Sequence, residues 1–378
     1  MGISFLFVLG WKSWFMKKTP LRVLVVAELL DNTLDCFVSQ MVDSEEVDVH
    51  ILRSKAGKTR KHVTYICPPI ALQRNPVLSF LWKILYVLRL GLEGNFSCVC
   101  AIFAYPHLYI ATLASFLSRK PLFYTVIASE WEFKGVSSVF QKLNEKILRR
   151  VSKVFVSGDR AIEYLMEQGI QTKNIVRYSI TELVNLDRFI PLGLDRSIDL
   201  ITLSRLVEGK NIETFIDIVA SLRESNPSIS AAIIGDGNLR GYFESYATSL
   251  GLSKNIRFHG YIPSFDDVNR ILNTAKIFVL NSCHEGGPFT VPEAMATGLC
   301  VVSSNVGEVA SIIDHGYNGF IIETYNDVEA YSRIIKQLLE DHEELHKIQE
   351  RAAAIKDRRK NRALARFWKE IAESNCKA

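Results

Sequence analysis

Residues 280–298 read Leu-Asn-Ser-Cys-His-Glu-Gly-Gly-Pro-Phe-Thr-Val-Pro-Glu-Ala-Met-Ala-Thr-Gly, and this stretch decides how the second half of the chain is organised. A buried strand is expected to end at about Leu280, and Pro292 suits the first turn of a helix. The loop between them brings glycines to a helix N-terminus, where unpaired N–H groups can bind an anion. Glu285 and Glu293 flank that loop, and carboxylates bind vicinal hydroxyl groups well. The stretch therefore predicts a ligand that carries both phosphate and sugar hydroxyls.

Strands and helices alternate on both sides of this stretch. Continuous apolar runs rich in β-branched residues are typical of strands buried in a parallel sheet. In the second half, such strands are expected at residues 199–203, 230–234, 256–259, 277–280, 300–303 and 320–322. Helices are expected at residues 211–224, 239–250, 265–274, 291–297 and 306–314, and over nearly all of the chain from residue 327 onward. This alternation predicts a parallel sheet covered by helices on both faces.

The first half repeats the pattern. It has candidate strands at residues 21–27, 47–52, 99–103, 122–127 and 154–157, and candidate helices at residues 77–90, 109–117 and 139–151. The predicted fold class is α/β, with two Rossmann-like, doubly wound domains that face a central cleft, because ligands bind at the carboxyl ends of parallel strands. The predicted boundaries are an N-terminal extension at 1–19, a first domain at 20–190, a second domain at 191–358 and a final helix at 359–378.

The composition fits two globular domains. The chain has 378 residues, 48% of them hydrophobic and 23% charged, so it is long enough for two cores and too apolar to be disordered. A net charge of +4 does not require nucleic acid as a partner. The 7 cysteines are odd in number and form no C-x-x-C pair, which predicts buried, reduced thiols in a cytosolic protein and no zinc site.

The first residues allow two interpretations. The apolar run at residues 3–9 is too short to span a bilayer core of about 30 Å, and it lacks the preceding charge and the cleavage site of a signal peptide. Trp11, Trp14 and Phe15 stand among lysines, a composition that can rest on a membrane surface. The other interpretation is that Met16 is the true start, because Met16-Lys-Lys-Thr-Pro leads directly into the first strand.

Two further motifs follow strands of the second half. In Leu-Ser-Arg-Leu-Val-Glu-Gly-Lys-Asn, Arg205 and Lys210 stand on the loop after the first strand, where ligands bind. Two fixed cations there can neutralise a diphosphate leaving group and so replace a metal ion. The strand that ends in Gly235-Asp236-Gly237 permits a close approach of backbone to a ligand, because glycine carries no side chain.

Taken in order, these motifs resemble a known family. S-R-L-V-E-G-K-N, I-G-D-G, F-H-G-Y, E-G-G-P-F-T-V-P-E-A-M-A-T-G and V-V-S-S-N-V-G-E are similar to the retaining GT-B glycosyltransferases of family 4, the glycosyl transferases group 1. The resemblance covers residues 200–322 and a piece at 184–191. It implies an enzyme, of hexosyltransferase type, that moves a sugar from a UDP-, GDP- or ADP-sugar to a glycan or lipid-linked acceptor. It further implies retention of configuration, no metal and no cofactor, in the synthesis of lipopolysaccharide, capsule or exopolysaccharide.

The resemblance assigns roles by position. It places Arg205 and Lys210 on the donor diphosphate, Glu285 on the transferred sugar and Glu293 on the ribose hydroxyls. The remaining donor-binding positions contribute phosphate contacts through backbone N–H groups or line the base pocket. They are Gly287, Phe289 and Thr290 for the phosphates, and Gly235, Asp236, Gly237 and Tyr261 for the base.

The first domain departs from the family pattern. The loop at residues 27–33 has no glycine, and Pro288 in the second domain removes one N–H donor. In Tyr-Thr-Val-Ile-Ala-Ser-Glu, Ile127 replaces the family's histidine and Glu130 its acid. The candidate acceptor-side residues are therefore Glu130 and His107, which is expected at the end of a strand.

Alternative functions stay open at this point. The first is a sugar-nucleotide epimerase of GT-B fold, and the second is a catalytically weak subunit that binds the donor. The helix at 77–90 carries Trp82, Lys83, Tyr86 and Arg89, for which core packing is the favoured interpretation and a membrane-facing helix the second. The final helix, with Phe367 and Trp368, resembles the family's crossover helix. The expected location is the cytoplasm, with a peripheral contact to the inner face of the membrane as the further hypothesis.

Overall fold

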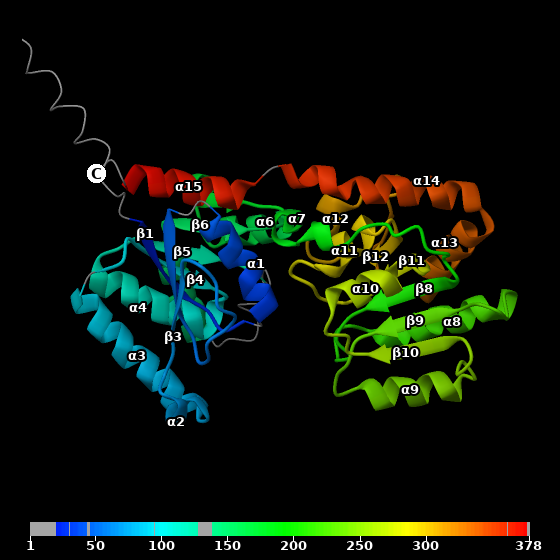
Figure 1. Cartoon of the computed structure of the whole chain (residues 1–378), viewed down its shortest axis with the longest axis horizontal. Helices are drawn as coiled ribbons and strands as arrows, with labels where there is room; N and C mark the ends of the chain where they lie inside the picture. Colours follow the sequence, from blue (N-terminus) through cyan, green and yellow to red (C-terminus); the bar gives the residue numbers. More distant parts are fainter. Residues whose placement is uncertain are drawn as a thin grey trace, which may run out of the picture. The chain divides into compact units, whose positions relative to one another are not determined.

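A computed structural model describes residues 20–29, 31–43, 46–93, 95–127, 138–360 and 362–375. It contains one sheet of seven strands and one of six, each flanked by helices (Figure 1). The predicted two-sheet α/β fold of GT-B type is thereby confirmed. The chain separates into two compact units, residues 1–125, 146–154 and 363–378 in unit 1 and residues 126–145 and 155–362 in unit 2. This division cuts through the first sheet, so the predicted boundary at residue 190 stays a prediction.

The first sheet has the order β3-β2-β1-β4-β5-β6-β7. Its strands are β1 Leu21–Val26, β2 Val47–Leu52, β3 Val63–Ile66, β4 Cys98–Ile102, β5 Leu122–Thr125, β6 Lys153–Val156 and β7 Ile175–Arg177. Strand β1 lies between β2 and β4 and pairs in parallel with both, with Val25 opposite Ile51 on one side and Cys100 on the other. Because β1 is central, nearly all of its residues are buried, as its continuous apolar sequence predicted.

The helices that follow these strands are α1 Asp31–Val42, α2 Ile70–Gln73, α3 Pro76–Glu93, α4 Tyr109–Ser118, α5 Ser138–Leu148, α6 Asp159–Glu167 and α7 Ile180–Leu183. Six elements of the first half were not predicted, namely helices α1, α2, α6 and α7 and strands β3 and β7. Strand β3 is an edge strand of only 4 residues with no buried member, so it lacks the apolar run that marks the central strands. Within the described residues, no helix combines the length and apolar character needed to cross a bilayer.

The last helix, α15 Ala363–Asn375, packs in unit 1. Trp368 is almost completely buried, and its ring lies 5.7 Å from that of Phe123 on β5. The ring of Phe367 lies 5.5 Å from the same phenylalanine. The aromatic pair therefore attaches the C-terminal helix to the first sheet, as expected of a crossover helix.

The second sheet has the order β10-β9-β8-β11-β12-β13. Its strands are β8 Ile198–Leu203, β9 Ala231–Ile234, β10 Ile256–Gly260, β11 Ala275–Leu280, β12 Cys300–Ser304 and β13 Phe320–Ile322, and every neighbouring pair is parallel. Its helices are α8 Ile212–Ser225, α9 Arg240–Ser249, α10 Phe265–Leu272, α11 Thr290–Ala296, α12 Val309–Ile312, α13 Val328–Glu340 and α14 His342–Ala353. All six predicted strands of this half are present. The helix expected at 306–314 is shorter because Gly307 has a left-handed φ of 54°.

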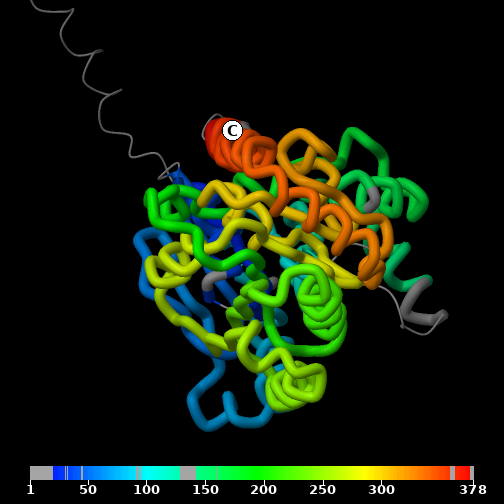
Figure 2. The backbone as a smooth tube through the Cα atoms, turned by 90° about the vertical axis from the view of Figure 1, so that its right-hand side faces the viewer, coloured from blue at the N-terminus to red at the C-terminus, as the bar shows by residue number. Residues whose placement is uncertain are grey.

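Alternate residues of the central strands in the second sheet belong to two separate hydrophobic cores. Ile277 and Val279 of β11 belong to a cluster with residues of α8 and α13, whereas Phe278 and Leu280 belong to a cluster with residues of α10 and α11. In Figure 2 the coils of α8 and α9 lie one above the other outside the sheet. Both faces of the strands are therefore apolar, which explains why their sequences are continuous hydrophobic runs rather than alternating ones.

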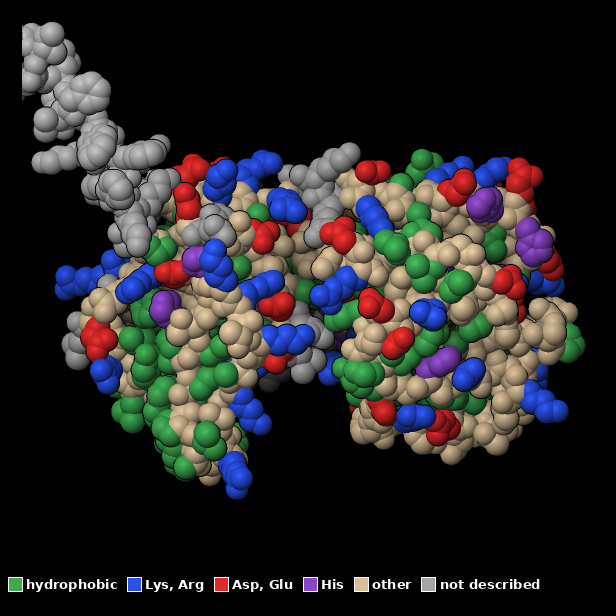
Figure 3. All heavy atoms as spheres, in the orientation of Figure 1, with side chains coloured by type: hydrophobic (Ala, Val, Ile, Leu, Met, Phe, Trp, Pro, Cys, Tyr) green, Lys and Arg blue, Asp and Glu red, His purple; other side chains and the backbone are tan. Residues whose placement is uncertain are grey.

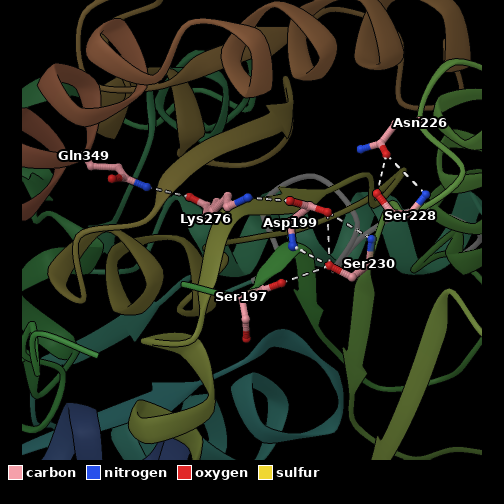
Figure 4. A network of polar contacts seen from close by, with 7 residues as sticks. All are labelled: Ser197, Asp199, Asn226, Ser228, Ser230, Lys276 and Gln349. Carbon is pink, nitrogen blue, oxygen red and sulfur yellow. Dashed lines mark hydrogen bonds and ion pairs between the residues drawn. The ribbon is translucent and has the colours of Figure 1, made fainter. Parts of the chain in front are cut away.

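A polar network joins the amino ends of three strands in this sheet (Figure 4). The buried Asp199 of β8 accepts hydrogen bonds from the Ser230 amide and hydroxyl, both at 3.0 Å, and pairs with Lys276 Nζ of β11 at 2.7 Å. The Lys276 carbonyl in turn accepts a hydrogen bond from Gln349 of α14 at 2.9 Å. One carboxylate thus connects β8, the start of β9 and β11, at the sheet edge opposite to the one where ligands bind.

Replacing Asp199 with alanine should destabilise the protein without weakening ligand binding. The change leaves the Ser230 donors and the Lys276 charge without their partner, which costs about 1–3 kcal/mol in the free energy of unfolding. Urea denaturation measures this loss. Asp195→Ala, at an exposed position of the same segment, is the matched control and should change stability by less than about 0.5 kcal/mol. Equal stability of the two variants would contradict the role given to the network.

Candidate functional site

The strand order of the second sheet reverses between β8 and β11, because the chain first adds strands on one side of β8 and then on the other. Loops that leave the carboxyl ends of two such strands diverge, and ligands bind in the crevice that forms there. The loop after β8 carries Arg205 and Lys210, and the loop after β11 carries Glu285. Three residues predicted from sequence motifs therefore lie at the topological switch point of this sheet.

The two loops are joined by a series of hydrogen bonds. The Cys283 amide donates to the Gly209 carbonyl at 3.0 Å, and the Asn281 side-chain amide donates to the Asn211 carbonyl. Next to them, Lys210 Nζ donates to Glu285 Oε1. The side chains of Lys210 and Glu285 are 17% and 14% exposed, so the pair is largely shielded from water. The structure thus brings together a cation and a carboxylate that are 75 residues apart in sequence.

Ser282 is a residue of this site that the sequence motifs did not indicate. Its hydroxyl donates to Glu285 Oε1 at 2.8 Å, and its own carbonyl accepts from Ser304 Oγ at 2.8 Å. Both Lys210 and Ser282 bind Oε1, and within the described part of the chain Oε2 has no hydrogen-bond partner. The glutamate is therefore held by one oxygen while the other is available to a ligand. A polar residue directly after a buried strand was the only sequence signal for Ser282.

Arg205 differs from Lys210 in its surroundings. It is exposed, and its guanidinium group makes no hydrogen bond or ion pair with the residues that the structure describes. Its backbone is fixed, since Leu206 and Asp236 are joined by a 2.9 Å hydrogen bond next to it. An unpaired guanidinium at a switch point can reach a phosphate group in two-point geometry.

The glycines of the Gly235-Asp236-Gly237 turn have a structural role beside the predicted one. A Cβ atom on Gly235 would lie 1.8 Å from the Ser204 carbonyl oxygen, and one on Gly237 would lie 2.2 Å from that of Leu206. The backbone that approaches these glycines closely is thus that of the neighbouring loop after β8. The Asp236 carboxylate accepts from the Gly237 amide at 2.8 Å and remains exposed.

Tyr261 follows the next strand, β10, and 70% of its surface is exposed. Its neighbour Gly260 accepts a hydrogen bond from the Gly235 amide at 2.9 Å, so the ends of β9 and β10 are joined. The predicted donor-side residues therefore occupy four adjacent strand ends of one sheet edge. The order of those strands is β10, β9, β8 and β11.

Glu293 lies in the first turn of α11, as predicted. Burial raises the pKa of its carboxyl group to about 8, and no side-chain hydrogen bond to the described residues offsets that effect. Phe289 packs partly against the core beneath α11. Gly287 faces Ile180, since a Cβ there would lie 2.4 Å from Ile180 Cδ1. The loop before α11 is therefore closely packed at Gly287, where a side chain would collide with Ile180.

Glu308 is a buried carboxyl group on the loop after β12. It accepts a hydrogen bond from the Ile180 amide at 3.0 Å, and its Cγ lies 3.2 Å from where a Cβ on Gly158 would be. Burial raises its pKa to about 7, although hydrogen bonds from Ile180, Ser157 and Gly158 favour the charged form. The glutamate connects the loop after β12 to α7 and to the turn before α6.

The first sheet has its own switch point, between β1 and β4. Glu28 follows β1 and accepts a hydrogen bond from Lys83 Nζ at 2.7 Å and one from the Ser54 amide at 2.9 Å. Lys83, on α3, also donates to Ser54 Oγ at 2.8 Å. Burial opposes ionisation of Glu28, but Lys83 and Ser54 outweigh it and lower the pKa of this carboxyl group below its usual value.

His107 lies beside this cluster, after β4, in the irregular turn Ala104–Leu108. The side chain is buried, and burial together with the charge of Lys83 lowers the pKa of the imidazole to about 4. The ring is thus neutral at physiological pH, and its buried Nδ1 has no hydrogen-bond partner among the described residues. The other acceptor-side candidate, Glu130, falls outside the residues that the structure describes.

The cysteines of the described residues form no disulfide, and Cys36, Cys67 and Cys283 are only partly buried. Cys98, Cys100 and Cys300 are buried, and burial raises the pKa of the Cys100 thiol to about 12. Cys376 falls outside the described residues. Within the same part of the chain, no three His, Cys, Asp or Glu side chains are grouped as metal ligands would be.

The raised pKa of Glu293 predicts a pH-dependent loss of stability in the ligand-free protein. Below pH 4.5 the carboxyl group is protonated in both the folded and the unfolded state, and from there to about pH 8 only the unfolded state ionises. Wild type should therefore lose about 1–3 kcal/mol relative to Glu293→Gln between pH 5 and 8. Denaturation series at several pH values measure the difference, with Glu329→Gln at an exposed site of α13 as control. A pH-independent difference would be the contrary result.

Part of the chain is similar to proteins of a known family. Residues 187–355 match the family model of glycosyl transferases group 1. The chain is 32% identical over 141 residues to the lipopolysaccharide core biosynthesis glycosyltransferase LpsE of Rhizobium meliloti, covering 37% of this chain and 39% of that one. It is 30% identical over 173 residues to an Escherichia coli UDP-Gal:alpha-D-GlcNAc-diphosphoundecaprenol alpha-1,3-galactosyltransferase, covering 42% and 44%. These alignments span less than half of the length of either relative.

Solved structures share the fold over nearly the whole chain. Anabaena HepE in complex with UDP superposes with a TM-score of 0.74 at 18% identity, covering 95% of this chain and 100% of that one. Sucrose-phosphate synthase from Thermosynechococcus elongatus gives 0.73 at 15% identity, covering 94% and 98%. The matched region from residue 187 to residue 355 contains the switch point of the second sheet and is similar to the glycosyl transferases group 1.

Proposed function

We propose that the protein is a glycosyltransferase that moves a sugar from a nucleotide-diphosphate donor to a glycan or lipid-linked acceptor in the synthesis of a surface polysaccharide. The observation that carries the proposal is the Lys210–Glu285 pair at the switch point of the second sheet, inside the region that matches the family. The names of the Rhizobium and Escherichia relatives support the polysaccharide context. The similarity to a structure with bound UDP-glucose supports a nucleotide sugar as donor.

The donor side follows from the chemistry of the two loops. Lys210 and Arg205 supply positive charge where the diphosphate leaves, and the free Oε2 of Glu285 accepts hydrogen bonds from hydroxyls of the transferred sugar. The carboxyl group of Glu293, which is neutral near pH 7, can both donate to and accept from the ribose diol. The same two cations take the role of a metal ion, so the proposed reaction needs neither a metal nor another cofactor.

The remaining donor contacts are proposed from the family pattern. Backbone groups of Gly287, Phe289 and Thr290 contact the phosphates, and the turn at Asp236 together with the exposed Tyr261 holds the base. The sugar is transferred with retention, by attack of the acceptor on the face from which the diphosphate departs. That route needs no nucleophile from the enzyme.

The acceptor side is proposed at the switch point of the first sheet. His107 offers a neutral imidazole with an unpartnered nitrogen, and Glu28 and Lys83 supply a fixed ion pair beside it. Such a set can orient an acceptor hydroxyl and receive its proton. We place this reaction in the cytoplasm, with a peripheral contact to the inner face of the membrane when the acceptor is lipid-linked.

Transfer is favoured over the two alternatives. The Rhizobium and Escherichia relatives are named as transferases, which disfavours an epimerase. A catalytically weak donor-binding subunit would bind the nucleotide sugar without turnover, and the two experiments below separate it from an enzyme.

The first experiment tests the donor site. Lys210→Ala and Glu285→Ala should each lower kcat/KM for transfer by at least about 100-fold, because each removes charge or hydrogen bonding at the reacting group. The donor is the UDP-, GDP- or ADP-sugar that gives the largest thermal shift, and release of its nucleoside diphosphate is measured. Lys254→Ala and Glu224→Ala, exposed residues elsewhere in unit 2, are the matched controls. Unchanged turnover in both site variants would refute these roles.

The second experiment tests the acceptor site. His107→Gln should lower the rate of transfer by about 10- to 100-fold while donor affinity and donor hydrolysis stay near wild type, because the imidazole is assigned to the acceptor alone. His259→Gln is the matched control, since that ring also has a buried nitrogen without a partner in the described structure but lies on β10. Thermal unfolding verifies that both variants fold. If His107→Gln lost donor hydrolysis and transfer to the same extent, the acceptor-side role of His107 would be contradicted.

A further inference from the structure

Helix α3 buries a serine and a lysine and exposes a set of large apolar side chains. Its buried face, toward the rest of unit 1, includes Ser79 and Lys83 together with Val87 and Leu90. Its outer face consists of large apolar side chains, of which Leu81 is 51% exposed and Leu85 65%. Among the described side chains of this helix, the exposed large apolar ones are Val77, Leu78, Phe80, Leu81, Leu85 and Leu88. A surface helix of a globular protein normally has the opposite arrangement.

Polar contacts fix this orientation. Lys83 Nζ bonds to Glu28 at 2.7 Å and to Ser54 Oγ at 2.8 Å, and the hydroxyls of Ser54 and Ser79 lie 3.0 Å apart. Rotation of α3 to bury its leucines would break these bonds and leave the Glu28 carboxylate without its cation. The apolar face is therefore held outward by the switch-point cluster of the first sheet, and it is not a poorly packed core surface.

The apolar face extends beyond α3. Ile70 of the adjacent α2 is 79% exposed, and Phe116 of α4, which packs against α3, is also exposed. Figure 3 shows hydrophobic side chains gathered over α2 and α3, with Lys and Arg side chains at their margin. A contiguous apolar surface of this kind on a water-soluble unit marks a site of interaction.

The charges of this region identify the partner. Residues 49–129 contain ten Lys and Arg and a single acid, Glu93. Four of the ten are held in ion pairs, Arg53 with Asp31, Arg60 with Asp35, Lys83 with Glu28 and Arg89 with Glu93. Lys55, Arg74 and Arg119 are exposed and make no ion pair with the residues that the structure describes. Arg74, between α2 and α3, is exposed beside the apolar face. Apolar residues with cations around them are what an anionic bilayer surface binds, whereas a second copy of the same cationic surface would repel it.

We propose that the outer face of α2 and α3 docks on an anionic membrane, with the apolar side chains in the headgroup region and the cations over the lipid phosphates. The proposal rests on the proposed function, because it explains how a lipid-linked acceptor is reached. The face of α3 opposite the membrane carries Lys83, which contacts the cluster beside His107. A lipid-linked acceptor anchored in the same bilayer would then be presented to that cluster.

The test is sedimentation of the full-length protein with vesicles, without nucleotide sugar. Wild type should bind vesicles of equal parts phosphatidylglycerol and phosphatidylcholine at least about tenfold more tightly than pure phosphatidylcholine vesicles, and binding should weaken between about 0.1 M and about 0.5 M NaCl. Leu81→Glu/Leu85→Glu should lower the partition coefficient at least about tenfold. Leu143→Glu/Met166→Glu, which puts the same charge at exposed apolar positions of α5 and α6, should bind like wild type.

Three outcomes overturn the proposal. The first is that wild type does not bind anionic vesicles. The second is that both double variants lose vesicle binding to the same extent. The third is that wild type is a dimer in buffer, Leu81→Glu/Leu85→Glu is a monomer, and neither form binds vesicles. Because the substituted side chains are exposed, circular dichroism should show that both variants fold. Binding of UDP, GDP and ADP, measured by calorimetry on the same samples, is independent of the vesicle result. Vesicle binding without binding of any of the three nucleotides would sink the proposed function and leave the docking surface intact.

Discussion

The ion pair between Lys210 and Glu285 is the contact on which the candidate site depends. It joins the loops after β8 and β11, the two strands between which the order of the second sheet reverses. The free-energy cost of removing two charges from water is nearly as large as the free energy gained from their attraction. Such a pair therefore adds little net stability. Its effect is to hold a cation and a carboxylate at fixed positions on the sheet edge where ligands bind. Ser282 strengthens that effect because it occupies the same carboxylate oxygen and leaves the other one free.

The sequence alone predicted the strands whose two faces are both buried. Central strands such as β1 and β11 are buried on both faces, so their residues form continuous apolar runs that stand out from their surroundings. Edge strand β3 and helix α1 were missed because each is partly exposed and its composition is mixed. The helix expected at 306–314 was too long because Gly307 has a positive φ. The same glycine lies so close to the loop after β11 that a Cβ atom there would be 2.5 Å from the Gly286 carbonyl oxygen.

The site was predictable residue by residue but not as a set of contacts. Motif spacing located Lys210, Glu285 and Glu293 on loops at one sheet edge, yet no pattern in the sequence shows that Lys210 and Glu285 touch. The glycines at 235 and 237 were expected to make room for a ligand, whereas the structure shows that they also make room for backbone from the loop after β8. Lys83 was placed on a helix for which core packing was the favoured interpretation and a membrane-facing helix the second. Its contact with Glu28 was not predicted, because the two residues lie 55 positions apart.

The two sheets use the same arrangement at their switch points. In each, a lysine bonds to a glutamate that a serine also contacts, Lys83 with Glu28 and Ser54 in the first sheet, Lys210 with Glu285 and Ser282 in the second. Apolar residues of similar volume would stabilise either position at least as well. Stability therefore gives no reason for a charged cluster at both switch points, whereas binding does, because each cluster provides fixed charges to a polar ligand at the edge where its sheet admits one. The outward apolar face of α3 follows from the same constraint, since the helix cannot both supply Lys83 to the cluster and bury its leucines.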